Sequence, residues 1–201
     1  MTIRAIVFDI GGVLEYTPDL GLAAKWEQKL RLQPGELDKQ LMPVWEGGSL
    51  GTHSLTEVHQ QIGDITGMSA TEVNEFMDDL WREYLGTLNE ELTQYFAGLR
   101  PRYQTAILSN SFVGAREKEQ AAYGFEELCD LIIYSHEVGL AKPDPRIFAL
   151  TCERLGVQPH EMIFLDDVAG HIAAANDFGI HGIQFHNNTQ AMADIEGKLV
   201  S

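Results

Sequence analysis

Four short apolar runs, each followed at once by a polar residue, constrain the fold of this 201-residue chain more than any other feature. The runs are Ile3–Phe8, Thr105–Leu108, Leu131–Tyr134 and Met162–Leu165, with Gly182–Phe185 as a fifth candidate. Their residues are mostly apolar in succession rather than in alternation, which is typical of strands buried on both faces of a parallel sheet. We therefore expect a buried parallel sheet.

Helical patterns lie between these runs. Asn89 is a suitable N-cap for a helix with apolar residues at helical spacing, and Asp144-Pro145 starts another that ends at Gly156. A third helix is expected to stop at Gly179. Alternation of strands and helices predicts an α/β fold, a doubly wound parallel sheet with right-handed crossovers.

One segment interrupts the alternation. Residues 16–86 show no strand pattern and read as four helices, two of which open with the capping boxes Ser54–Glu57 and Ser69–Glu72. We expect residues 1–15 and 87–201 to form an α/β core domain and residues 16–86 to form a helical cap domain that can act as a lid.

Composition excludes several classes of partner. The formal net charge is −16, from 14 Lys and Arg against 30 Asp and Glu. Such a chain repels nucleic acid and anionic membranes, and no apolar run is long enough to cross a bilayer. The two cysteines form no metal or redox motif. These features predict a cytoplasmic protein, either a monomer or a homodimer, with no nucleic-acid or membrane partner.

Polar side chains gather where the predicted strands end. They are Asp9, Ser109, Asn110, Lys142, Asp166 and Asp167. In a parallel sheet the carboxyl ends of the strands share one edge, which is where ligands bind. Carboxylates brought together repel unless a cation lies between them, and oxygen ligands suit Mg²⁺. The sequence thus predicts a magnesium site at this edge.

The same edge has the groups needed to bind a phosphate. Lys142 supplies a positive charge, Ser109 and Asn110 supply hydrogen-bond donors, and Gly11 and Gly12 allow backbone N–H groups to approach closely. An ionised aspartate in line with phosphorus can form an aspartyl-phosphate.

Taken in order, these motifs resemble those of the haloacid dehalogenase superfamily over nearly the whole chain. The matching segments are Ile6–Val13, Ile107–Asn110, Gly139–Pro143 and Phe164–Asp167. The helical insert resembles the family's C1 cap. In detail the chain is similar to the N-terminal phosphatase domain of soluble epoxide hydrolases and to bacterial sugar-1-phosphate phosphatases.

The resemblance implies a role for each residue of the edge. Asp9 would be the nucleophile and a Mg²⁺ ligand, joined by the Gly11 carbonyl and Asp167. Asp166 would bind the metal through water or orient Lys142, which would neutralise charge on Asp9 and the phosphate. Ser109 and Asn110 would hold the transferring phosphoryl group.

The chain departs from the family at Gly11, where the usual residue is an aspartate that acts as general acid and base. This loss predicts that substrates with good leaving groups are hydrolysed best, since acid–base catalysis is worth roughly 10²–10⁴-fold. His53 and Glu57 are possible replacements, although an exposed helix start is the preferred interpretation of both. His171 is interpreted as a solvated residue at a helix start.

Three functions remain open at this stage. The first is a Mg²⁺-dependent hydrolase of a small phosphorylated metabolite. The second is a metal-independent 2-haloacid dehalogenase, which the pair Asp166-Asp167 disfavours. The third is a weakened phosphometabolite-binding or regulatory protein, which only Gly11 favours.

Overall fold

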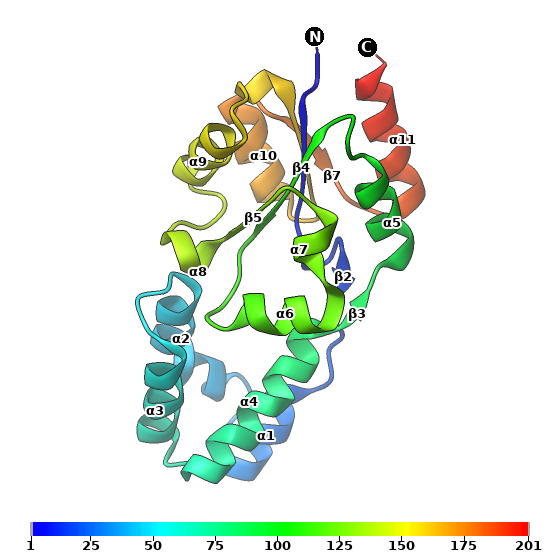
Figure 1. Ribbon diagram of the computed structural model, residues 1–201. Helices are drawn as coiled ribbons and strands as arrows, with labels where there is room; N and C mark the ends of the chain where they lie inside the picture. Colours follow the sequence, from blue (N-terminus) through cyan, green and yellow to red (C-terminus); the bar gives the residue numbers. More distant parts are fainter. Residues whose placement is uncertain (1, 201) are drawn as a thin grey trace.

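The computed structural model describes residues 2–200, and its centre is a five-stranded sheet (Figure 1). The strands are β1 (Ala5–Phe8), β4 (Gln104–Ser109), β5 (Leu131–Tyr134), β6 (Met162–Asp166) and β7 (His181–Gln184). Their order is β5-β4-β1-β6-β7, and every neighbouring pair is parallel. The predicted parallel sheet is confirmed, with β1 at its centre and the order reversing beside it.

Helices cover both faces of the sheet, so each strand is buried on both sides. They are α5 (Glu90–Gly98), α6 (Ala115–Tyr123), α7 (Phe125–Leu128), α8 (Ser135–Val138), α9 (Pro145–Leu155), α10 (Ala169–Phe178) and α11 (Asn188–Leu199), with a 3-10 turn at Pro159–Glu161. Ile6 and Phe8 of β1 pack with α5, α7 and α11, whereas Ala5 and Val7 pack with α9 and α10. This packing explains why the strands are apolar in succession.

The insertion is helical, as predicted. Its four helices are α1 (Leu22–Leu30), α2 (Glu36–Ser49), α3 (Leu55–Thr66) and α4 (Ala70–Leu85). They surround an apolar core of their own that includes Trp26, Leu41 and Phe76. Both predicted capping boxes are present. In Figure 1 this helical cap lies at the end of the molecule opposite the two termini, beyond the carboxyl ends of the strands.

A short antiparallel ribbon carries the chain between core and cap. It consists of β2 (Glu15–Tyr16) and β3 (Thr87–Leu88), so Tyr16 is an exception to the expectation that residues 16–86 contain no strand. Both chain crossings lie in this ribbon. The proposed limits of the core (1–15 and 87–201) and of the cap (16–86) fall within it and stay a prediction.

The cap is seated on the loop that follows β4. The Phe112 ring packs so closely on Gly48 of α2 that a Cβ at Gly48 would lie 2.0 Å from it. Val113 N donates a hydrogen bond to Gly48 O at 3.1 Å, and Ser135 Oγ donates one to Ser49 O at 2.8 Å. These contacts hold the cap directly over the carboxyl edge of the sheet.

Four helices of the core have no counterpart in the sequence prediction, namely α6, α7, α8 and α11. Helix α6 buries only Ala115 and Glu119, so it shows no apolar period. Helix α8 is one turn long, and α11 buries only Ala191 and Ile195. Across residues 2–200, none of the helices is long and apolar enough to cross a membrane.

Candidate active site

Asp9 is the centre of the site, at the end of the central strand. Lys142 Nζ lies 2.8 Å from Asp9 Oδ1 and 2.7 Å from Asp166 Oδ2. Ile10 N donates a second hydrogen bond to Asp9 Oδ1, at 2.8 Å. The Lys142 side chain is fully buried (0% exposed). Within residues 2–200, no hydrogen bond reaches the other Asp9 oxygen, Oδ2, which is left for a substrate or a cation.

The two carboxylates that share Lys142 differ in their ionisation. Burial raises the pKa of Asp9, and the Asp166 charge adds to that effect, although Lys142 opposes both. The pKa of Asp166 is lowered: hydrogen bonds and the Lys142 charge outweigh its burial. Asp166 is therefore the anion that Lys142 compensates, and a further cation beside Asp9 would favour the ionised form of that carboxylate.

His171 contacts the site and is not simply solvated as predicted. Its Nδ1 lies 3.0 Å from Asp166 Oδ2, and Val168 N donates to Asp166 Oδ1 at 2.8 Å. One side-chain atom each of Asp9, Asp166 and His171 could ligate a metal ion, and these three atoms lie within 4.8 Å of one another. The start of α10 brings His171 back over β6, because the helix begins only three residues after the strand.

The Asp167 carboxylate lies directly against Gly12 and is the third carboxylate of the site. Gly12 has φ 72°, and a Cβ placed on it would lie 2.5 Å from Asp167 Oδ2. Any side chain at position 12 would therefore collide with that carboxylate as well as strain the backbone. Burial and the Asp166 charge raise the pKa of Asp167. Carboxylates gathered in this way, with too few cations of their own, fit a hard divalent ion such as Mg²⁺.

Ser109 and Asn110 lie beside Asp9 at the end of β4, as predicted from the strand ends. Ser109 is buried. The Asn110 amide is clamped on the backbone of Lys142: Nδ2 donates to Lys142 O and Oδ1 accepts from Lys142 N, both at 2.8 Å. Asn110 thus positions the lysine loop. A direct contact of Ser109 or Asn110 with a phosphoryl group stays a prediction.

Comparison with known proteins identifies the family. Residues 3–179 match the family of haloacid dehalogenase-like hydrolases. The chain belongs to this family. Among curated relatives, bifunctional epoxide hydrolase 2 of Sus scrofa is 27% identical over 98% of this chain, which spans only 39% of that longer protein. D-ribitol-5-phosphate phosphatase of Bacteroides thetaiotaomicron is 28% identical over 92% of this chain and 93% of its own length.

A solved structure shares the architecture of this hydrolase. A haloacid dehalogenase family enzyme from Bacteroides thetaiotaomicron, in complex with magnesium and inorganic phosphate, superimposes with a TM-score of 0.79. The alignment covers 94% of this chain and 98% of the other, at 22% identity. This likeness confirms the predicted haloacid dehalogenase-like fold with its helical insertion.

Two buried carboxylates near Asp9 escaped sequence reasoning. Glu15 lies in the ribbon, with Oε1 at 3.9 Å from where a Cβ on Gly11 would stand and Oε2 buried without a hydrogen-bond partner. Glu119 of α6 accepts a hydrogen bond from the Tyr134 hydroxyl. Burial raises the pKa of each to about 7. Glu15 could have been suspected because it directly follows the apolar pair Val13-Leu14.

The candidate replacements in the cap make local contacts within the cap. The Glu57 carboxylate accepts from Ser54 N at 2.7 Å and closes the capping box of α3. The His53 ring lies against Gly47, where a Cβ would approach it to 2.0 Å. Within the described part of the chain, no hydrogen bond joins either residue to Asp9 or Lys142. Their assignment as an acid or base gains no support.

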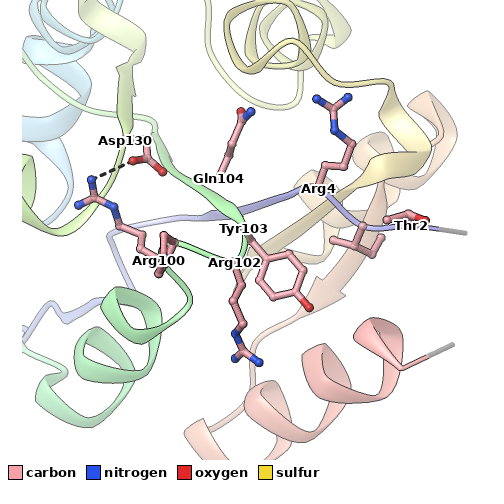
Figure 2. Close-up of a pocket in the computed structure, with 9 residues that line it drawn as sticks. Thr2, Arg4, Arg100, Arg102, Tyr103, Gln104 and Asp130 are labelled. Carbon is pink, nitrogen blue, oxygen red and sulfur yellow. Dashed lines mark ion pairs between the residues drawn. The ribbon is translucent and has the colours of Figure 1, made fainter.

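A pocket of about 510 Å³ lies at the opposite edge of the sheet, where the strands begin (Figure 2). It is lined by Arg4, Arg100 and Arg102 at the amino ends of β1 and β4. Two of these charges are paired: Arg4 with Glu161 at 3.2 Å and Arg100 with Asp130 at 2.9 Å. Because ligands of parallel sheets bind at the carboxyl edge, the Asp9 site is the candidate active site.

Proposed function

We propose that this hydrolase is a Mg²⁺-dependent phosphatase that cleaves a small phosphorylated metabolite through an aspartyl-phosphate on Asp9. The observation that carries the proposal is the state of the Asp9 carboxylate. Its Oδ1 is held by Lys142 and Ile10 N, while Oδ2 is free of hydrogen bonds within residues 2–200. One oxygen is oriented and the other is available as a nucleophile.

The proposed reaction has two steps. Asp9 Oδ2 attacks phosphorus, the P–O bond to the organic group breaks, and the departing oxygen takes a proton from water. A second water then attacks the phosphorus and gives its proton to the hydroxide that the first water became, the bond to Asp9 breaks, and inorganic phosphate leaves while Asp9 is regenerated. Lys142 stays within 2.8 Å of Asp9 Oδ1 and stabilises negative charge in both steps.

The residues present suit a resident Mg²⁺. Asp9, the Gly11 carbonyl and Asp167 would hold it, with Asp166 ligating through water or keeping Lys142 in place. Bound there, the ion would offset charge on the phosphate. His171 belongs to the same group through Asp166, which it contacts at 3.0 Å. The relatives described above support this assignment, since one carries phosphatase in its name and another binds magnesium and phosphate.

A panel of phosphorylated metabolites tests the proposal. Phosphate release should depend on Mg²⁺ and vanish in Asp9→Asn, while circular dichroism of the variant stays unchanged. Asp130→Asn, at the opposite edge of the sheet, is a matched control that should retain turnover. Full activity in a well-folded Asp9→Asn protein would exclude Asp9 as nucleophile.

Two further measurements, halide release and ligand binding, separate the two alternatives. Metal-independent halide release from a 2-haloacid, without phosphate release, would identify a dehalogenase. Tight phosphometabolite binding without turnover would identify a binding or regulatory protein.

A further inference from the structure

A pocket of about 340 Å³ lies between the cap and the core, next to the catalytic edge. Trp45 of α2 and Leu80 and Tyr84 of α4 line it from the cap, and Phe112, which follows β4, lines it from the core. The Trp45 and Phe112 rings meet edge to face, with centroids 5.7 Å apart. The walls are therefore aromatic and aliphatic, and in residues 2–200 no Asp, Glu, Lys, Arg or His lines the pocket.

Most polar side chains of the lining already have partners, and within residues 2–200 the Ser49 hydroxyl is an exception. Ser111 Oγ is hydrogen-bonded to His136 Nδ1 at 2.7 Å, and Ser135 Oγ donates to Ser49 O at 2.8 Å. The Tyr84 hydroxyl lies near the Glu119 carboxylate, and burial together with this carboxylate raises the pKa of Tyr84. The amide of Asn110 is committed to the Lys142 backbone. Several hydroxyl groups entering this pocket would lose their hydration, and beyond unbonded groups such as the Ser49 hydroxyl they would have to compete for groups that are already bonded.

The pocket adjoins the phosphate end of the site. Asn110 lines the pocket and also holds the backbone of Lys142, whose Nζ contacts Asp9. A phosphoryl group in contact with Asp9 and Lys142 would therefore leave the organic part of the ester facing the cap. Since cap and core are already in contact through Phe112 and Gly48, that organic part would be enclosed by the apolar walls.

We propose that this pocket receives the organic part of the substrate, and that the substrate is an apolar alkyl or aryl phosphate rather than a sugar or polyol phosphate. The proposal rests on the phosphatase function proposed above and adds the class of substrate. It separates this chain from the relative named for ribitol 5-phosphate, because a polyol would bring several hydroxyl groups into a pocket where, within residues 2–200, few unbonded side-chain groups such as the Ser49 hydroxyl could receive them.

Binding of phosphonates tests the pocket without requiring turnover. In the presence of Mg²⁺, n-hexylphosphonate should bind roughly 1000-fold more tightly than methylphosphonate in calorimetry, because it buries five more CH₂ groups and each contributes about a fourfold gain in affinity. Equal affinities of the two phosphonates would overturn the proposal. Leu80→Asn should remove most of the preference, whereas Met42→Asn, on an exposed site of α2, should leave it intact.

Turnover distinguishes failure of this proposal from failure of the phosphatase function. n-Hexyl phosphate and a hexitol 6-phosphate have the same carbon number and a primary alkyl leaving group, so their chemical steps are matched. We expect kcat/KM to favour the hexyl ester by ~100-fold, the order that a buried hydroxyl costs in an apolar pocket. Mg²⁺-dependent release from acetyl phosphate with no hexyl preference would leave the phosphatase standing and overturn the substrate class. Absence of Mg²⁺-dependent release from any ester would refute the phosphatase function and, with it, this proposal.

Discussion

Replacing Glu119 with glutamine should change how the stability of the protein depends on pH. Glu119 is buried (1% exposed) on α6, where its carboxylate accepts a hydrogen bond from the Tyr134 hydroxyl. Burial raises its pKa from 4.5 to about 7, and the Asp9 charge adds to this effect. The folded protein therefore binds a proton that the unfolded chain has already released.

The magnitude follows from the difference between these two pKa values. A pKa that rises from 4.5 to about 7, at roughly 1.4 kcal/mol per pKa unit, contributes about 3 kcal/mol to the free energy of unfolding. Between these values the folded state binds more protons than the unfolded state, so the free energy of unfolding falls as the pH rises. The contribution is fully present below pH 4.5 and is lost as the pH passes about 7. Glutamine does not titrate, and Glu119→Gln should remove this loss.

Urea denaturation of the metal-free protein at pH 5 and pH 8 measures the effect. From pH 5 to pH 8 the wild type should lose about 2–3 kcal/mol more of its unfolding free energy than Glu119→Gln does. Glu117→Gln, exposed on the same helix, is the matched control and should follow the wild type within about 0.5 kcal/mol. Parallel pH profiles of wild type and Glu119→Gln would refute the reasoning, because they would mean that Glu119 ionises in the folded protein as it does in water.

Four further substitutions, two of them combined in one cycle, test the catalytic edge. Lys142→Met should abolish phosphate release and lower the unfolding free energy of the metal-free protein by about 3–5 kcal/mol in urea denaturation. Mg²⁺ should restore part of that stability. Unchanged stability would contradict the buried ion pair of Lys142 with Asp9. Gly12→Ala should cost about 1–3 kcal/mol and weaken Mg²⁺ binding in calorimetry, because its Cβ would displace Asp167; unchanged Mg²⁺ affinity would exclude that displacement. Gly11→Asp would place a second carboxylate near Glu15, so this variant should be less stable at pH 8 than at pH 5. Glu15→Gln should relieve that loss of stability in a double-mutant cycle. Additive effects of the two substitutions would show that the two carboxylates do not meet.

The strands and helix ends could be predicted because their causes are local. The run Leu131–Tyr134 is β5 to the residue, and the cap at Asn89 and the stop at Gly156 rest on side chains and glycines at the positions themselves. Helix α6 could not, since its buried face carries Glu119, a residue that sequence patterns assign to solvent. What stabilises α6 is a contact with Tyr134 in β5, which only the folded chain brings near.

The same distinction between local causes and contacts made only in the folded chain applies to the candidate site. That Asp9, Lys142 and Asp166 meet follows from the rule that ligands gather at the carboxyl ends of parallel strands, and the structure brings them within hydrogen-bond distance. The contact of His171 with Asp166 was missed because it depends on the angle at which α10 leaves β6. No pattern in the sequence records that angle.

Gly11 shows why a missing residue is hard to interpret from sequence alone. Read by itself, it removes a carboxylate from the first motif and suggests a weakened enzyme. In the fold, the ribbon returns Glu15 to within 3.9 Å of where the Gly11 side chain would begin, so the space is already bordered by a carboxylate four positions along the chain. A larger residue at position 11 would meet that carboxylate, which is buried and partly unpartnered. The effect of a substitution at Gly11 therefore depends on Glu15, which the sequence motif alone does not include.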